Sequence, residues 1–224
     1  LVENTSTGLN IIANMLEYPS GSNIVTTDLE YPSVVYPWLR KKLGVKIRYV
    51  KNVDGKIILE DVEKAVDDKT TVLAISHVEY MNGFRNDLDS LADIAHEHGA
   101  YFAVDAIQSA GAIQTDVKRE HVDFLTTGCY KWLLGPAGAG YLYVRKELIE
   151  KFEPPMVGWA SVEPEVFETV DFWDIWSLKL SETASRFEVG CPSFMSYAGA
   201  AAALKLLLNF GMANVEKRIL SLTD

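Results

Sequence analysis

The sequence predicts an α/β fold of three layers, in which a mostly parallel sheet carries helices on both faces. Two observations predict this class. Short apolar segments of strand length alternate along the chain with longer segments of helical periodicity, and this alternation is typical of parallel sheets. The chain has 224 residues, which is enough to bury a substantial core in one domain. The sequence shows no internal repeat and no low-complexity segment.

The individual elements can be placed in order. The polar segment Asn4–Asn10 precedes the apolar residues 11–16 and predicts a helix start, because hydroxyl side chains cap helix N-termini. Further helices are expected at residues 34–43, 59–66 and 88–98, the first and last of them closed by Gly44 and Gly99. Strands are expected at residues 24–27, 45–50, 71–76, 101–104, 121–125 and 140–144.

The composition of each strand predicts its exposure. The strand at 45–50 alternates polar and apolar residues and should be half exposed, whereas the apolar runs at 71–76 and 101–104 are typical of strands covered on both faces. Residues 153–180 are rich in Trp and acidic side chains and are expected to form a long active-site or interface loop. Residues 198–209 are expected to form a helix of small residues that packs against the sheet.

Composition excludes several classes of protein. The net charge of −10 argues against binding to nucleic acid, which requires basic patches. No apolar run approaches the roughly 20 residues needed to span a bilayer, and no signal peptide is visible. The two cysteines, Cys129 and Cys191, provide neither a disulfide framework nor a metal cluster. We therefore expect a cytoplasmic protein with no bound metal and no membrane contact.

Lys131 is the most informative residue. It follows the expected strand at 121–125 and precedes a glycine-rich turn, Gly135–Gly140. A lysine delivered by a strand into a tight loop is placed to be desolvated, and desolvation favours the neutral, nucleophilic form of an amine. The alternative is an ordinary surface lysine, because most charged side chains are exposed.

Asp105 supports the catalytic interpretation of Lys131. It stands at the carboxyl end of the expected strand at 101–104, where open α/β sheets bind ligands. Pyridoxal 5'-phosphate (PLP) needs a lysine for its Schiff base and a carboxylate that keeps its pyridine nitrogen protonated. Gln108 could donate a hydrogen bond to the phenolic oxygen of the ring. The alternative for Asp105 is a cap of the following turn.

Three segments resemble the motifs of class V aminotransferases, the fold-type I PLP group that includes cysteine desulfurases, kynureninase and isopenicillin N epimerase-like proteins. Val104–Gln108 resembles V-D-x-x-Q, Tyr130-Lys131 resembles the family's His-Lys or Tyr-Lys pair, and Arg186–Gly190 resembles R-F-E-x-G. The resemblance implies an enzyme that holds PLP on Lys131, with Asp105, Gln108 and Tyr130 around the cofactor.

The same resemblance implies positions for the phosphate and the ring of PLP. Thr5, Ser6 and Thr7 match the family's T-T-E-G-x-N turn, which binds the cofactor phosphate. A helix start gathers free N–H groups and suits an anion, although these residues could also act only as caps. Tyr31 matches the position at which an aromatic or imidazole ring stacks on the pyridine. A buried core tyrosine is the alternative at that position.

Other matches concern the substrate and a second subunit. His77 and Tyr80 lie in a segment that resembles the family's S-H-V-x-x-x-x-G turn, which implies contact with the substrate; a structural histidine is the alternative for His77. Trp159 and Cys191 match segments that reach the neighbouring subunit's cofactor. The resemblance therefore implies a homodimer with shared active sites that acts on an amino acid.

The resemblance also implies a domain organisation. Residues 1–210 would form the PLP-binding large domain, truncated at its N-terminal part, and residues 211–224 would begin a linking helix to a small C-terminal domain. The arginine that binds the substrate carboxylate belongs to that small domain in the family. The chain is therefore expected to be a fragment or a partial record.

Several reactions remain open. Transamination, elimination and epimerisation share the same cofactor residues. A cysteine desulfurase would need its catalytic cysteine outside this chain, because Cys129 adjoins Lys131 and Cys191 lies in the phosphate-facing turn. A non-catalytic relative that keeps the fold is a further alternative. A nucleotide-binding Rossmann module is excluded, because no G-x-G-x-x-G follows an early strand.

Overall fold

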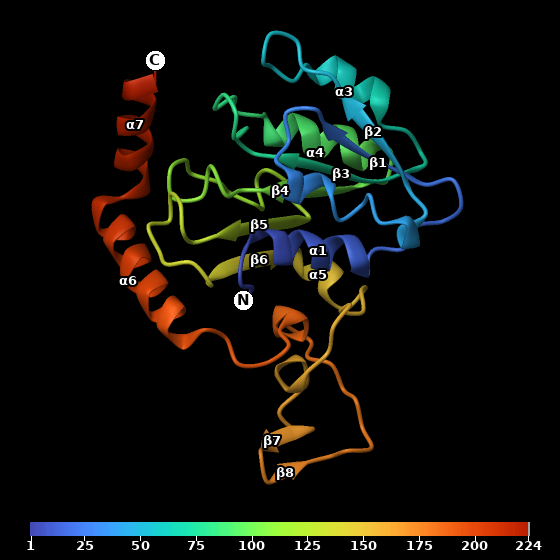
Figure 1. Cartoon of the computed structure of the whole chain (residues 1–224), viewed down its shortest axis with the longest axis vertical. Coiled ribbons are helices and arrows are strands. Elements are labelled where there is room, and N and C mark those ends of the chain that lie inside the picture. The colour runs from blue at the N-terminus through green and yellow to red at the C-terminus, as the bar shows by residue number, and fades with distance from the viewer. Residues whose placement is uncertain (224) are drawn as a thin grey trace.

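Six strands form one sheet at the centre of the computed structural model, which describes residues 1–223. The spatial order is β2-β1-β3-β4-β5-β6 (Figure 1). The first five strands are parallel, and the last strand is antiparallel to its neighbour. The bounds are Asn23–Thr27 for β1, Lys46–Val50 for β2, Thr70–Ser76 for β3, Tyr101–Asp105 for β4, Phe124–Gly128 for β5 and Gly140–Val144 for β6.

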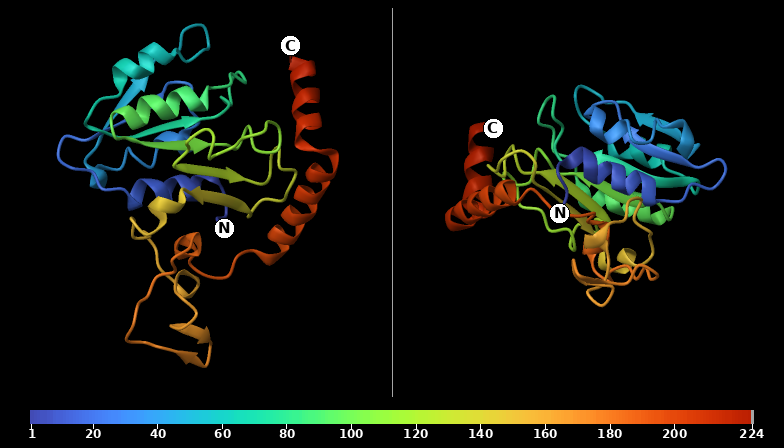
Figure 2. Two further views of the ribbon diagram at one scale, coloured as in Figure 1. Left: turned by 180° about the vertical axis from the view of Figure 1, so that it is seen from behind. Right: turned by 60° about the horizontal axis from the view of Figure 1, so that its bottom comes forward.

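Two apolar clusters cover the two faces of this sheet. Successive residues of a strand point to opposite faces, so Val72 packs in one cluster and Leu73 in the other. The first cluster contains residues of α1 (Thr5–Met15) and α5 (Lys146–Ile149), and the second contains residues of α3 (Leu59–Ala65) and α4 (Leu88–Glu97). The views in Figure 2 show these helices on opposite sides of the sheet. The three-layer α/β prediction is confirmed.

The start of α1 is set by its cap and by one glycine. The Asn4 side chain accepts a hydrogen bond from the Thr7 N–H at 2.9 Å and so caps the helix. One turn further on, a Cβ atom at Gly8 would lie 2.0 Å from Thr126 Oγ1 of β5. Glycine is therefore required for α1 to lie this close to the sheet, and the close approach brings the helix start to the carboxyl ends of the strands.

Two expected elements have different bounds. The helix expected at 34–43 is replaced by α2 (Pro32–Val35) and the 3-10 turn η1 (Lys41–Leu43), because Pro37 has no N–H to continue the helix. The strand expected at 121–125 begins only at Phe124. His121 has a φ of 49°, which is incompatible with a strand, and the Val122 N–H donates to the Val117 carbonyl in a turn.

The C-terminal third departs further from the expectation. Helix α6 (Phe194–Phe210) packs through Ala200 and Leu207 against Cys129 and Leu133 in the loop after β5. It also contacts the sheet at β6, where the rings of Tyr197 and Tyr141 meet with centres 6.2 Å apart. The loop at 153–180 projects from the body of the molecule (Figure 1) and contains η2 (Trp159–Ser161), β7 (Phe167–Thr169) and β8 (Phe172–Trp173), with η3 (Ala184–Phe187) after it.

Helix α7 (Met212–Thr223) follows α6 after a break at Gly211, whose φ is 81°. This break coincides with the expected boundary between residues 210 and 211, although the domain assignment itself stays a prediction. Asp224, the last residue of the expected linking helix, lies outside the described residues. Within residues 1–223, no single helix is long and apolar enough to cross a membrane; the pair α6–α7, bent by 80°, reaches that length and composition only when taken together.

The buried carboxylate of Asp123 joins four elements at the amino-terminal ends of β4 and β5. Asp123 Oδ2 accepts from the Phe102 N–H at 2.8 Å and lies 2.9 Å from His96 Nε2 of α4. Asp123 Oδ1 lies 2.7 Å from the Arg145 guanidinium that follows β6. A single side chain thus holds the ends of α4, β4, β5 and β6 together.

Replacement of Asp123 by alanine should lower the free energy of unfolding by about 2–4 kcal/mol, because it leaves the Phe102 N–H without a partner and Arg145 without its anion. Urea unfolding followed by circular dichroism measures the loss. Asp93→Asn on the exposed face of α4 is the control and should change stability by less than about 0.5 kcal/mol. Equal stabilities of the two variants would contradict the role given to Asp123.

Candidate active site

A crevice is expected between β1 and β3, because β2 lies on one side of β1 and all later strands lie on the other side. Strand β1 lies between β2 and β3, so the segments that leave β1 and β3 diverge and leave room for a ligand. Tyr31 follows β1 and Tyr80 follows β3, and their rings meet edge to face with centres 5.2 Å apart. Tyr31 is 48% exposed, so it is not the buried core tyrosine that the sequence left open.

Lys131 extends into the same region from the turn after β5. Its Nζ atom lies 5.9 Å from the centre of the Tyr31 ring. The turn is tight, because the Leu134 N–H donates to the Lys131 carbonyl at 3.0 Å and the Gly135 N–H donates to the Cys129 carbonyl at 2.8 Å. The Lys131 side chain is exposed, so the desolvation expected from sequence is wrong for the chain by itself: the turn shapes the backbone but does not cover the amine.

Asp105 ends β4 and is buried beside this lysine. Its Oδ1 atom accepts from the Ile107 N–H at 2.9 Å, so it does cap the following turn, as the alternative proposed. Burial raises the pKa of Asp105 to about 6, against the opposing effects of the Ile107 hydrogen bond and of the Lys131 charge. The charges of the Asp105 carboxylate and the Lys131 amine therefore influence each other.

Tyr130 and Gln108 complete this cluster. Burial raises the pKa of the Tyr130 hydroxyl, and the nearby Asp105 and Tyr31 side chains add to this effect. Gln108 is half-buried, and its amide has no hydrogen-bond partner within residues 1–223. Its side chain is thus available to a ligand at the strand ends.

The start of α1 provides polar groups of two kinds. Thr5 Oγ1 is buried and has no hydrogen-bond partner among the described residues, and Ser6 Oγ lies 2.7 Å from Ser33 Oγ, two residues after Tyr31. By contrast, the N–H and the hydroxyl of Thr7 both bind the Asn4 side chain. Thr5 and Ser6 therefore suit an anion at the helix start, whereas Thr7 acts within the cap.

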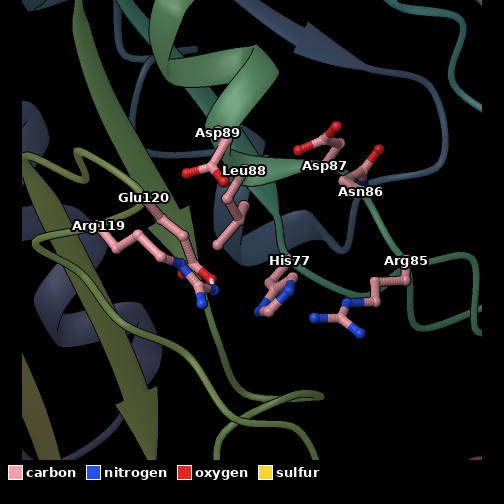
Figure 3. A pocket seen from close by; sticks show the side chains of 8 residues that line it. All are labelled: His77, Arg85, Asn86, Asp87, Leu88, Asp89, Arg119 and Glu120. Carbon is pink, nitrogen blue, oxygen red and sulfur yellow. Dashed lines mark hydrogen bonds and ion pairs between the residues drawn. The ribbon is translucent and has the colours of Figure 1, made fainter.

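His77 lies in a different place from the one expected. Its side chain is 1% exposed, and Nδ1 lies 3.3 Å from Thr115 Oγ1. It faces a pocket of about 270 Å³ whose lining includes Arg85 and Arg119 but neither Lys131 nor Asp105 (Figure 3). His77 and Ser76 are successive residues and point in opposite directions. The structure therefore separates His77 from Tyr80 and from the lysine.

Trp159 and Cys191 lie together on the irregular C-terminal segment. A Cβ atom at Gly190 would lie 3.2 Å from Trp159 Nε1. Cys191 is exposed and lines a pocket of about 530 Å³ together with Asn4 and Thr7 at the start of α1. Their contact with a neighbouring subunit stays a prediction.

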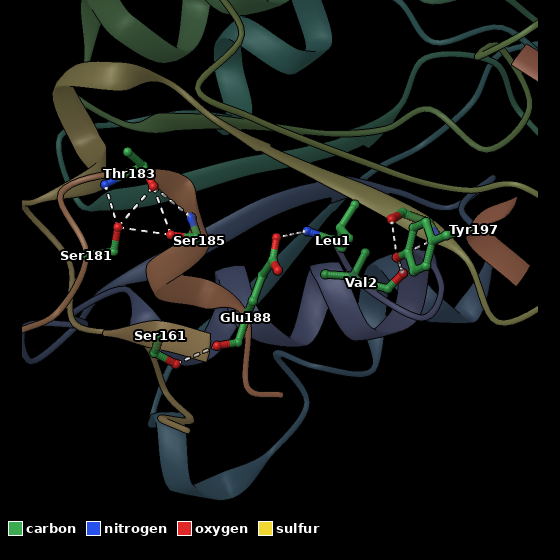
Figure 4. A network of polar contacts seen from close by, with 9 residues as sticks. Leu1, Val2, Ser161, Ser181, Thr183, Ser185, Glu188 and Tyr197 are labelled. Atoms are coloured by element: carbon green, nitrogen blue, oxygen red, sulfur yellow. Dashed lines mark hydrogen bonds and ion pairs between the residues drawn. The ribbon is translucent and has the colours of Figure 1, made fainter. Parts of the chain in front are cut away.

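Polar contacts hold this C-terminal segment against the body of the chain (Figure 4). The Tyr197 hydroxyl lies 2.7 Å from the Val2 carbonyl oxygen and 2.9 Å from that of Gly140. The Ser161 hydroxyl donates to the Glu188 carbonyl. These contacts place the segment that carries Cys191 beside the first residues of the chain.

Two buried acids at the crevice were not expected. Glu30 Oε1 and Oε2 accept from the N–H and hydroxyl of Ser76 at 2.7 and 2.6 Å. Glu79 is 1% exposed and accepts from the Asn86 side chain at 2.9 Å. The sequence does contain a signal that could have identified these acids: each forms a Glu-Tyr pair shortly after a buried strand. Burial raises the pKa of both carboxyls, that of Glu30 well above its usual range.

Comparisons with known proteins agree with this arrangement. The family profile described as aminotransferase class-V matches residues 1–224. A probable cysteine desulfurase of Pyrococcus abyssi is 36% identical over 221 residues, which cover 96% of this chain and 53% of the relative. The chain thus spans about half the length of the curated relatives it matches.

Solved structures share the fold. The apo structure of a cysteine desulfurase from Thermococcus onnurineus has a TM-score of 0.86 at 35% identity, and the match covers 96% of this chain and 53% of that one. A mutant of C-DES, with glycine covalently linked to its PLP cofactor, has a TM-score of 0.85 at 25% identity over 97% of this chain and 56% of that one.

His77 should remain neutral throughout the physiological range. Burial lowers the pKa of His77 to about 4; Arg85 adds to this effect and Glu216 opposes it. Proton NMR titration of the imidazole signals should show one histidine that titrates near pH 4, assigned by its absence from His77→Asn. His121, which is exposed, is the internal control. A His77 signal that titrates near pH 6.5 would show that the side chain is hydrated.

Proposed function

Because the chain belongs to the aminotransferase class V family, whose members use PLP, we propose that it forms the cofactor-binding part of a PLP-dependent enzyme that acts on an amino acid. The observation that carries the proposal is the position of Lys131. Its amine lies 5.9 Å from the exposed Tyr31 ring, next to the buried Asp105 carboxylate, at the crevice of the sheet.

The residues of this crevice fit PLP in three respects. Asp105 is a buried carboxylate at a strand end, as a pyridine nitrogen requires. The Thr5 hydroxyl is buried at the start of a helix and has no hydrogen-bond partner among residues 1–223, which suits a phosphate. Tyr31 offers an open aromatic face for stacking. When bound, PLP supplies an electron sink for the bonds at the substrate's α-carbon.

Each side chain then has a definite task. Lys131 would hold the cofactor covalently and is the group placed to move a proton at the substrate. Asp105 would keep the ring nitrogen protonated, and Gln108 would donate to the ring's phenolic oxygen. Thr5 and Ser6 would hold the phosphate. Tyr80, edge-on to the ring of Tyr31, lies where it limits the space for the substrate side chain.

For the reaction, we propose cleavage of the carbon–sulfur bond of cysteine. Its support is the name of the relatives, which are cysteine desulfurases. Cys129, two residues before Lys131, is fully buried, and Cys191 lies beside the start of α1, so neither cysteine offers an exposed thiol beside the Lys131 amine. Transamination is the second candidate, because it uses the same cofactor residues and needs no catalytic thiol.

Borohydride reduction of the PLP-treated chain should place a pyridoxyl label on Lys131, because this amine is the one beside the ring-binding residues. Peptide mass mapping locates the label. Lys151, another exposed lysine near a tyrosine ring, is the matched control: Lys151→Ala should keep the label and Lys131→Ala should lose it. A label that persists in Lys131→Ala would reject the proposal.

The PLP-treated chain, before borohydride reduction, separates the two reactions. With dithiothreitol present as sulfur acceptor and two-electron reductant, addition of L-cysteine should give alanine and sulfide from a desulfurase, whereas a transaminase converts an amino acid into its keto acid and leaves the sulfur in place. Product analysis by mass spectrometry distinguishes them. If PLP binds but no added amino acid changes the absorbance of the bound cofactor, the protein is a non-catalytic relative.

We further propose that two copies share their sites and that Trp159 and Cys191 help to close the phosphate site of the partner. Trp159 is 50% exposed, and aromatic side chains are enriched in interfaces. Size-exclusion chromatography with light scattering should show PLP absorbance on a dimer peak, and Trp159→Ala should weaken PLP binding several-fold. The control Trp173→Ala changes an exposed tryptophan of β8 and should have a smaller effect. A PLP-loaded monomer would contradict this assembly.

A further inference from the structure

Three carboxyl groups meet at the floor of the crevice, and each comes from a different segment. Glu30 follows β1, Glu79 follows β3, and Asp105 ends β4. Ser76 connects them, because its N–H and hydroxyl bind Glu30 while its backbone pairs with Asp105 in the sheet. All three side chains are at least nine-tenths buried.

Hydrogen-bond donors are distributed unevenly among these acids. Both oxygens of Glu30 have a donor from Ser76, and Asp105 Oδ1 has the Ile107 N–H. Glu79 has one donor, the Asn86 amide, which also donates to the Ser76 carbonyl at 2.9 Å. Glu79 Oε2 is buried and has no partner within the described residues. It is therefore the carboxyl oxygen least suited to carry charge.

The surrounding charges act in the same direction. Asp28, just after β1, and Asp105, at the end of β4, repel a negative charge on Glu79, and Glu79 in turn raises the pKa of Glu30. Lys131 acts on Asp105, and Arg85, in the turn that follows Glu79, pairs with Glu216 of α7 at 3.3 Å. No cation within residues 1–223 forms an ion pair with Glu79. Adjacent buried carboxyls with one nearby cation cannot all ionise together.

We propose that Glu79 is a positioning residue that holds a proton near neutral pH, leaves Asp105 as the ionised carboxylate of the crevice, and releases its proton to solvent when a positively charged ring binds against Asp105. The release follows because a cation in the crevice stabilises the Glu79 carboxylate. The first part concerns the chain alone, and the second rests on the proposed function.

The proton on Glu79 can be tested without cofactor. Burial, opposed by Asn86 and reinforced by Asp105 and Asp28, raises the pKa of Glu79 to about 7. A carboxyl with a raised pKa in the folded state destabilises the fold as pH rises from its unfolded pKa to its folded pKa. Glu79→Gln removes this loss. The folding constant of E79Q relative to wild type should therefore rise by about a hundredfold between pH 4.5 and pH 7.5.

Urea unfolding of the cofactor-free chain at a series of pH values measures this ratio. Glu63→Gln, at an exposed position of α3, is the matched control and should give a ratio that stays constant with pH. If E79Q does not fold, Glu79→Met supplies the same comparison, because it also removes the titrating group and keeps the length of the side chain. A constant ratio for the Glu79 variant overturns the proposal.

Calorimetry tests the coupling to the cofactor. Titration of PLP into wild type and E79Q, in buffers of different ionisation enthalpy at pH 6 to 8, gives the number of protons released on binding. Wild type should release up to one proton more than E79Q, with the largest difference near pH 7. Equal proton numbers overturn the coupling. If neither protein binds PLP, the proposed function and the coupling both fail, and the unfolding series still decides whether Glu79 carries the proton.

Discussion

The register of three parallel strands is the constraint on which the rest of the site depends. Ser76 pairs with Asp105, and Asp105 pairs with Thr126, so these residues form one row across β3, β4 and β5. Successive strand residues point to opposite faces, and a slip of one residue would send Asp105 to the other face. Apolar residues on both faces of these strands hold the register, because a slip would expose or bury every one of them incorrectly.

Burial gives the crevice its electrostatic character. Asp105, Glu30 and Glu79 lie where water is excluded, and burial raises the pKa of each carboxyl. An isolated buried carboxylate is costly. The chain lowers that cost with donors from Ser76 and Asn86, which belong to the strand β3 and to the turn before α4. The stability of this edge and its chemistry therefore depend on the same hydrogen bonds.

Two tight backbone features deliver the remaining groups. Gly8 allows α1 to contact Thr126 of β5, and this contact brings the Thr5 hydroxyl to the strand ends. The turn after β5 contains Leu134 with a φ of 57°, a left-handed conformation that costs energy for a residue with a branched side chain. This conformation closes the turn from which the Lys131 side chain projects toward Tyr31.

Local pattern was sufficient for much of this protein. The alternation of strands and helices predicted the layers. The strand ends of a parallel sheet lie together, which predicted that Lys131 and Asp105 belong to one site, and the family resemblance added Tyr31. The start of α1 was predicted in the same way, although the side chain that caps it is Asn4 and not a hydroxyl group.

Other features follow from contacts between segments that are far apart in the sequence. Strand β5 begins at Phe124 because His121 turns the chain, and His77 faces away from Lys131 because its side chain packs near Thr115, which is distant in sequence. The burial of Glu30 and Glu79 likewise depends on partners more than five residues away in the chain. Local sequence patterns were enough to predict the elements and the row of strand ends. Which side chains are buried, paired or exposed there depends on contacts between distant segments, which no local pattern records.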